Sequence, residues 1–415
     1  MTALSLDRLL GALHDVPRND LAALRFAGRY EPAAGPEAKV FPPGYPTDAR
    51  QALTGPYLIE KRYVDGEAVD TVLLDSVASQ ANRIEDALLD AVTYERISLP
   101  LLIVSDTIHG RKIELTSLAM PHRCSDAYLQ DSEEADGEKR RFDQTELGRQ
   151  LRLAQLRDAT VVYRHCPTAL VFGTWDSHRG KPERSFRVPR SYSSELFGVS
   201  PLPGLRVGHR LDPLGMLGGR VIVEPGGPEN PRWQLATTQE ETAEGGTDDR
   251  PVDALPRGER QDKLSNVGHG NSPLPFVATG GVAVTSIHRR AALSLAGLRR
   301  LRFPIDGKGD ADRDASGRAV LAALALLGDR LAFGAPADLS LRSGCDLVLM
   351  DEQIDAIHRG GEEEEIEASA EQCIDLLSQA RAAATSLGLP WVDEPQRFRP
   401  TAYLKRALEA NLITV

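Results

Sequence analysis

The chain has 415 residues, more than one domain usually holds, so we expect two domains or one core with large insertions. No apolar run approaches the ~20 residues that a membrane-spanning helix needs. The formal net charge of −11 disfavours a surface coated with nucleic acid, although a local basic groove is still compatible with it. The four cysteines form no C-x-x-C pair, which argues against a disulfide framework and a zinc ribbon and predicts a cytoplasmic protein.

The first half of the chain predicts two helices and two hairpins. Residues 1–23 predict a helix because four leucines share one helical face, and charged residues interrupt any signal-peptide core. Residues 77–92 place apolar side chains at helical spacing, with Asp75 or Ser76 available as the N-cap. Alternating apolar runs flank two dipeptides that favour tight hairpin turns, Asp65-Gly66 and His109-Gly110.

The second half contains one long irregular stretch. Residues 224–273 are dominated by Gly, Pro, Glu, Asp and Asn, which predicts a mobile insertion. The remaining regular elements are predicted as helices over 142–159, 317–333 and most of the last fifty residues, strands over 168–177 and 345–352, and a strand leading into a helix within 275–303. Because hairpins and helices interleave without strict alternation, the pattern favours an α+β sheet with helices on one face over a doubly wound parallel sheet.

The stretch VFGTWDSHRGK, residues 171–181, combines an acid, a hydroxyl, an imidazole and two cations. A Ser-His-Asp site needs side chains that converge in space, whereas three consecutive residues diverge, and no G-x-S-x-G elbow surrounds Ser177. We expect residues 171–175 to anchor a strand in the core. From residue 179 to 190 one acid, Glu183, stands among Arg179, Lys181, Arg184, Arg187 and Arg190, so an anion is the expected ligand of this stretch.

Metal and nucleotide motifs give no cofactor. The pairs His122-x-Cys124 and His165-Cys166 do not complete a four-ligand zinc pattern. Residues 310–317 resemble the start of a calcium loop, but Ala315 and Leu321 replace the required Gly and Glu, so Asp314 and Ser316 are expected to cap the following helix. No phosphate-binding G-x-x-x-x-G-K-[ST] occurs.

The junction at residues 75–80 is a second place where an anion can be held. A strand there leads directly into a helix, whose first N–H groups lack helical partners and carry the positive end of the dipole. Gln80, Asn82 and Arg83, together with Ser79, line the polar side of this helix. The alternative is a capped, solvated face without a ligand.

Several segments together resemble one family. VLLDSVASQANRIEDALL, ALVFGTWDSHRG, SSELFGV and GHRLDPLGM resemble four segments, in the same order, of the backbone subunit of type I-U CRISPR interference complexes, the subtype also called I-G. KVFPPGYP and MPHRCSDAYL fit the same family. The resemblance runs from about residue 25 to 300 and includes little of the C-terminal third.

The resemblance implies a RAMP-superfamily fold, with a core like an RNA recognition motif (ferredoxin-like). Residues 1–415 are then one palm domain with insertions, and residues 300–415 form a helix-rich part packed on the core. A thumb hairpin is expected either around His109-Gly110 or within residues 224–273. Such subunits stack along a CRISPR RNA with further copies of themselves and other subunits, and the guide pairs with target DNA.

The resemblance also implies RNA contacts, without catalysis, cofactor, metal or membrane. The expected RNA-contacting residues are His178, Arg179, Lys181, Arg210, Arg83, Asn82, Gln80 and Arg123. The alternative is a metal-dependent nuclease that cuts target RNA, for which Asp176 is the candidate acid.

Overall fold

The computed structural model describes residues 2–45, 56–136, 138–176, 187–206, 220–223, 233–235, 260–263, 278–335 and 338–412. The chain divides into two compact units. The larger unit contains Met1–Leu202 and Val282–Ile413, and the smaller contains Pro203–Gly281. None of the described helices is long and apolar enough to cross a membrane.

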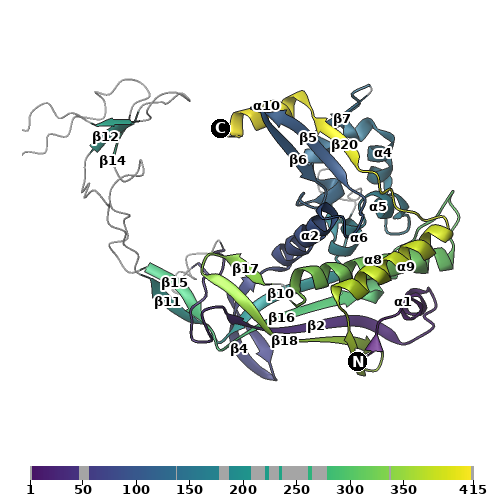
Figure 1. The fold of residues 1–415 in the computed structure, drawn as a ribbon, viewed down its shortest axis with the longest axis horizontal. Helices are drawn as coiled ribbons and strands as arrows, with labels where there is room; N and C mark the ends of the chain where they lie inside the picture. The colour runs from purple at the N-terminus through teal and green to yellow at the C-terminus, as the bar shows by residue number, and fades with distance from the viewer. Residues whose placement is uncertain are drawn as a thin grey trace, which may run out of the picture. The chain divides into compact units, whose positions relative to one another are not determined.

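A large, mostly antiparallel sheet organises the first unit (Figure 1). Its strand order is β1-β19-β18-β2-β16-β10-β4-β3, with β17 paired to β18, and only β1 and β19 run parallel among these pairs. The strands are β1 (Thr2–Ala3), β2 (Leu21–Pro32), β3 (Ile59–Val64), β4 (Glu67–Asp75), β10 (Tyr192–Val199), β16 (Ser286–Ser294), β17 (Leu339–Arg342), β18 (Cys345–His358) and β19 (Glu363–Glu367).

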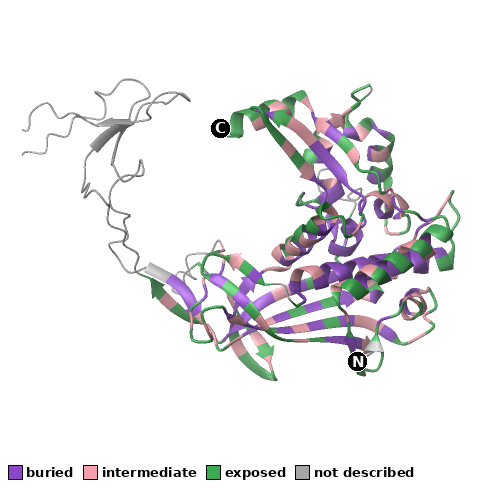
Figure 2. Ribbon diagram, viewed as in Figure 1, coloured by how far each residue is buried: buried purple, intermediate pink, exposed green. Residues whose placement is uncertain are grey.

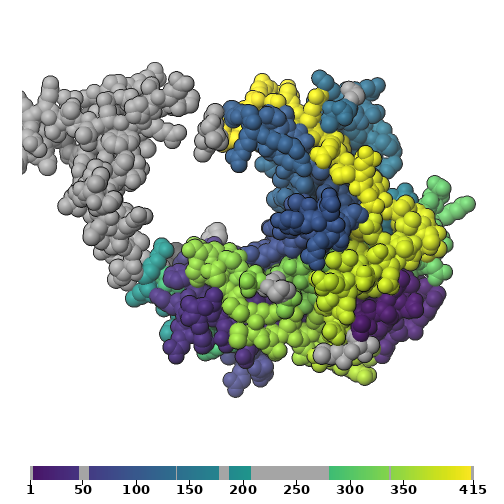
Figure 3. Space-filling view, in the orientation of Figure 1, coloured from purple at the N-terminus to yellow at the C-terminus, as the bar shows by residue number. Residues whose placement is uncertain are grey.

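Helices cover one face of this sheet. The 23-residue helix α8 (Ala311–Phe333) is buried along most of its length and packs on β16, α2 (Val77–Thr93) and α9 (Ala370–Ser386) (Figure 2). Each fully buried leucine of α8 contributes about 1.5–3 kcal/mol relative to an exposed one. Helix α1 (Leu6–Leu13) packs on α8 and contacts α9, so a helix from the N-terminal part of the chain and one from the C-terminal part lie in one layer (Figure 3).

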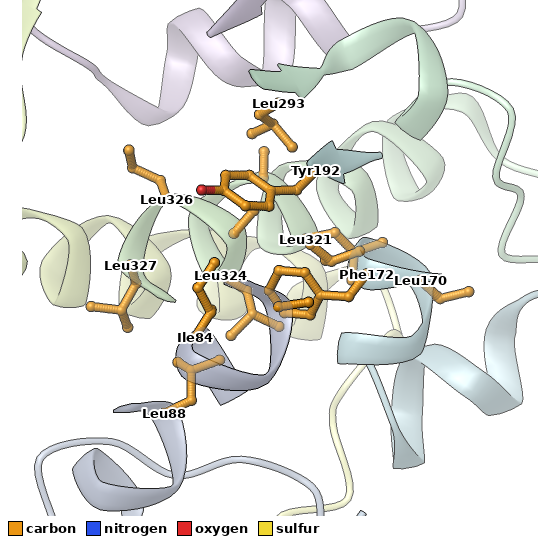
Figure 4. Close-up of a cluster of buried hydrophobic side chains, with 14 of the residues drawn as sticks. Ile84, Leu88, Leu170, Phe172, Tyr192, Leu293, Leu321, Leu324, Leu326 and Leu327 are labelled. Carbon is orange, nitrogen blue, oxygen red and sulfur yellow. The ribbon is translucent and has the colours of Figure 1, made fainter. Parts of the chain in front are cut away.

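The core lies between the sheet and these helices. Side chains from α2, α6 (Thr168–Phe172), β10, β16 and α8 meet there (Figure 4). Gly328 of α8 sits where a Cβ atom would lie 2.5 Å from the Cγ2 atom of Ile84, so only glycine lets α8 approach α2 this closely. The packing therefore fixes the position of α2 against the sheet.

A smaller sheet with order β6-β5-β20-β7 and further helices also belong to the first unit. Strand β20 runs parallel to β5 and antiparallel to β7, and the last helix, α10, packs on β5 and β20. The elements are β5 (Leu102–Ile108), β6 (Arg111–Thr116), β7 (Ser132–Glu134), β20 (Gln396–Pro400), the short helices η2 (Arg123–Ser125), α3 (Ala127–Gln130), η3 (Phe142–Gln144), α4 (Glu146–Leu153), α5 (Thr160–His165) and α7 (Leu295–Leu298), and α10 (Ala402–Asn411).

The second unit contains two small groups of strands. Strand β11 (Leu202–Arg206) pairs with β15 (Ala278–Ala283), and β12 (Arg220–Val223) lies between β13 (Trp233–Leu235) and β14 (Arg260–Lys263). The insertion predicted over 224–273 lies outside the described residues except for β13 and β14.

The α+β class is confirmed, and so are the best-defined local predictions. Both hairpins form, and all four turn residues, Asp65, Gly66, His109 and Gly110, have the positive φ angles that tight hairpin turns require. Helix α2 begins after Ser76, whose hydroxyl accepts a hydrogen bond from the N–H of Ser79. The apolar helix and the strand at 345–352 also form, and both are longer than predicted.

Other local predictions are wrong. The helix predicted over 1–23 ends at Leu13, because Pro17 and its polar neighbours break it, and β2 begins at Leu21. The predicted helix 142–159 contains η3 and α4 as separate short helices. The cap of α8 is Asp310, whose side chain accepts from the N–H of Arg313, and neither Asp314 nor Ser316 caps it.

The strand predicted over 168–177 is also wrong. Residues 168–172 form the short helix α6, and only β8 (Thr174–Trp175) is a strand. Every residue of α6 is buried, and an apolar run that is buried all round shows no period that separates helix from strand. Gly173 ends the helix with a φ of 85°.

Candidate nucleic-acid interface

A two-stranded stem holds the two ends of the cationic stretch together. Strand β8 pairs antiparallel with β9 (Arg187–Val188), with Thr174 opposite Val188 and Trp175 opposite Arg187. His178, Arg179 and Lys181 belong to the segment between these strands, which lies outside the described residues, as does Arg210. The structure thus describes the base from which three of the predicted RNA contacts extend.

The backbone of β8 is fixed from one side by the turn His122–Ser125. The Thr174 hydroxyl donates to the carbonyl oxygen of His122 at 3.1 Å and lies 3.2 Å from the hydroxyl of Ser125. A Cβ atom on Gly173 would lie 2.9 Å from the carbonyl oxygen of Val188, so the stem needs glycine at this position. The stem is therefore presented from a rigid backbone.

Arg123 connects this turn to helix α2. Its Nε and Nη2 atoms donate to the two carboxylate oxygens of Glu85, each at 2.6 Å, and its Nη1 atom donates to the carbonyl oxygen of Gly173 at 2.7 Å. Both side chains are buried. Burial raises the pKa of Glu85, and the adjacent Arg123 guanidinium opposes this shift. Arg123 thus holds α2, the turn and the start of β8 in one arrangement.

The N-terminal turn of α2 is engaged by other parts of the protein. The Gln80 amide donates to the buried carboxylate of Asp75 at 2.5 Å, and Arg83 donates to the same oxygen at 2.9 Å. Arg83 also donates to the carbonyl oxygen of Ser340 in β17 at 3.0 Å. The polar side chains of this turn therefore connect β4, α2 and β17.

A buried polar network continues from Gln80 into the core. The Ser194 hydroxyl donates to Gln80 at 2.7 Å and accepts from Arg289 at 3.0 Å. Arg289, with no exposed surface, donates to the hydroxyl of Tyr192 at 2.7 Å and forms an ion pair with Asp329 of α8. Burial opposes ionisation of Asp329, but Arg289 and Arg330 outweigh it and lower the pKa of this carboxyl. The network joins β10, β16 and α8 to the start of α2.

The four described members of the predicted RNA-contacting set differ in accessibility. Gln80 and Arg123 are buried and bound to protein groups, and Arg83 is partly exposed and likewise bound. Asn82 is exposed on α2. Gln80, Arg83 and Arg123 thus have defined roles inside the protein, and RNA contact by any of the eight residues stays a prediction.

Sequence reasoning missed Trp175. The indole, expected in the core, is 56% exposed, and the guanidinium carbon of Arg187 lies 5.9 Å from its ring centroid. Arg190, two residues beyond β9, is also exposed. The sequence could have indicated its role, because Trp175 precedes a run of cations, and aromatic stacking together with positive charge is typical of proteins that bind single-stranded nucleic acid.

Asp176, the candidate nuclease acid, follows β8 and is buried at 8% exposure. It lines a small pocket with Ser125 and Arg152. Within the described ranges, no three His, Cys, Asp or Glu side chains lie close enough together to hold a metal ion. All four cysteines are buried free thiols.

One family model matches the chain. Residues 24–201 match the family described as CRISPR-associated protein GSU0053. The matched region includes α2, the turn His122–Ser125, the stem and β10, and it ends before the second compact unit. No curated protein matches the chain. Residues 24–201 of this chain are thus similar to a CRISPR-associated family.

Proposed function

We propose that this protein is a non-catalytic, RNA-binding backbone subunit of a CRISPR interference complex, of the type I-U or I-G subtype. In this function, copies of the chain line up along the guide RNA, contact its phosphates, and leave the bases free to pair with target DNA. Sequence is then read by base pairing, and the protein needs only groups that accept any base. The other subunits of the complex are its further partners.

The observation that supports this proposal best is that the cationic stretch lies between two paired strands. Arg179 and Lys181 lie in the chain between β8 and β9, which pair with each other. The start of β8 is held by hydrogen bonds of Gly173 and Thr174 to the turn His122–Ser125, all within the region that matches the CRISPR-associated family. A cationic segment fixed at both ends loses less conformational freedom on binding than a free one. The acidic remainder of the protein disfavours binding of nucleic acid elsewhere on its surface.

The salt dependence of RNA affinity tests this proposal. Each phosphate neutralised on single-stranded RNA adds about 0.7 to the magnitude of the slope of log affinity against log salt. Replacing Arg179 and Lys181 with alanine is therefore expected to reduce that magnitude by about 1.4, measured by fluorescence anisotropy with labelled single-stranded RNA over a salt series.

A matched control removes the same charge elsewhere. Lys405 and Arg406 lie on α10, and their double alanine variant is expected to leave the slope unchanged. A wild-type protein that does not bind RNA would overturn the proposed function. A slope that stays unchanged in the Arg179/Lys181 variant would remove this segment from the RNA-contacting surface.

A cleavage assay distinguishes the proposed function from the nuclease alternative. Assembled complex incubated with complementary RNA and Mg²⁺ is expected to leave the RNA intact. Periodic cuts that disappear in Asp176→Ala would replace the binding-only function with a catalytic one. The burial of Asp176 beside Ser125 and Arg152 favours a structural role for this carboxylate.

A further inference from the structure

Trp175 has the environment of a ligand-binding aromatic more than that of a core residue. Its side chain is 56% exposed, whereas Trp391, in the same unit, is 7% exposed and packs against Tyr163. Single exposed apolar residues are common on protein surfaces and carry no meaning by themselves. The surroundings of Trp175 supply the further observations.

The first observation is rigidity. The two residues that precede Trp175 are fixed: Thr174 donates to the carbonyl of His122, and Gly173 accepts from Arg123. Trp175 itself is paired in register with Arg187 across the stem. A ring presented from such a backbone loses little freedom when a flat ligand stacks on it.

The second observation is the local charge. The Arg187 guanidinium lies beside the indole ring, 5.9 Å from its centroid, and its side chain is exposed. No carboxylate within the described part of the chain forms an ion pair with Arg187. The same strand pair bounds the segment that contains Arg179, Lys181 and Arg184. An aromatic face next to the cation of Arg187 fits a ligand with a planar ring and a phosphate.

We propose that Trp175, with Arg187 beside it, forms a stacking platform for one base of single-stranded RNA at the foot of the cationic segment. The platform deepens the proposed function and rests on it. Every base has a π face, so stacking on indole tolerates any sequence, which suits a subunit that must accept any guide. Arg187 contributes a cation next to the phosphate that follows the stacked base.

The test compares RNA with an abasic strand of the same length and charge. Wild-type protein is expected to bind the strand with bases more tightly, and Trp175→Ala is expected to weaken binding to that strand roughly 5- to 150-fold. Affinity for the abasic strand is expected to stay the same, because the indole carries no charge. The salt slope is expected to stay the same for the same reason, whereas Arg179→Ala/Lys181→Ala changes it.

The chain offers a matched control and a conservative variant. Tyr403 on α10 is 78% exposed with the Arg406 guanidinium carbon 5.0 Å from its ring centroid. Tyr403→Ala therefore removes an equivalent aromatic side chain beside a cation and is expected to leave RNA affinity unchanged. Trp175→Phe keeps an aromatic face and is expected to retain most of the affinity. RNA is expected to quench tryptophan emission more strongly in the wild type than in Trp175→Phe, which retains Trp233 and Trp391.

The possible outcomes separate the two proposals. Trp175→Ala that binds like the wild type, or quenching as strong in Trp175→Phe as in the wild type, overturns the platform while the proposed function stands. Loss of binding to abasic and normal strands alike also overturns it, because the defect is then structural. Wild-type protein that binds neither strand overturns the proposed function itself.

Discussion

Replacing Arg123 with alanine is expected to lower the free energy of unfolding by about 3–5 kcal/mol. The change leaves the carboxylate of Glu85, 1% exposed, without its bidentate partner and deprives the carbonyl of Gly173 of its donor. A buried charge without a partner costs far more than the lost attraction alone. Urea unfolding of the purified variant and of the wild type measures the difference.

A double-mutant cycle separates this effect from the loss of packing. Replacing both Arg123 and Glu85 is expected to cost clearly less than the sum of the two single replacements, because no charge is then left buried. Burial raises the pKa of Glu85 in the folded state above its value in the unfolded chain. In Arg123→Ala the folded state therefore binds more protons, and the loss of unfolding free energy relative to the wild type, the deficit, becomes smaller as the pH falls. A deficit below about 0.5 kcal/mol at neutral pH would show that the pair does not stabilise the fold.

Replacing Asp329 with alanine is expected to be similarly costly, about 3–5 kcal/mol. This carboxylate has no exposed surface and is the shared partner of Arg289 and Arg330. Its loss leaves the Arg289 guanidinium in the core with the neutral oxygens of Tyr192, Ser194 and Gln80 as its hydrogen-bond acceptors. The remaining carboxylate, Glu352, lies 3.9 Å away. Thermal unfolding followed by circular dichroism is the measurement.

The same helix provides the control. Asp312 lies in the first turn of α8 with its side chain 68% exposed, near the side chains of His14 and Arg18. Asp312→Ala is expected to cost less than about 1 kcal/mol. If Asp329→Ala and Asp312→Ala lowered the free energy of unfolding by the same amount, the buried network around Asp329 would stabilise the fold no more than the exposed Asp312 does.

Local chemistry explains which elements the sequence predicts. The hairpins at Asp65-Gly66 and His109-Gly110 form because the turn residues themselves favour positive φ angles. Helix α2 is predictable from its apolar spacing and the Ser76 cap. Helix α6 is not, because five buried residues in a row show no period and only Gly173 marks their end.

The candidate site depends on pairings that a single sequence does not show. Gln80 and Ser194, or Glu85 and Arg123, are far apart along the chain and meet only after the sheet and α2 pack. Gln80 and Arg123 were therefore expected to face RNA, whereas in the structure they form buried hydrogen bonds to other parts of the protein. The exposed side of Trp175 depends in the same way on the pairing of β8 with β9.

RNA that accompanies the protein through purification tests the proposed function most directly. The protein is co-expressed with its partner subunits and a CRISPR locus, purified through an affinity tag at moderate salt, and its nucleic acid is extracted and sized. RNA of CRISPR-spacer length, in an amount reduced by Arg179→Ala/Lys181→Ala and unchanged by Lys405→Ala/Arg406→Ala, is the expected result. A preparation without such RNA, from a complex that is otherwise intact, would contradict a guide-binding backbone subunit.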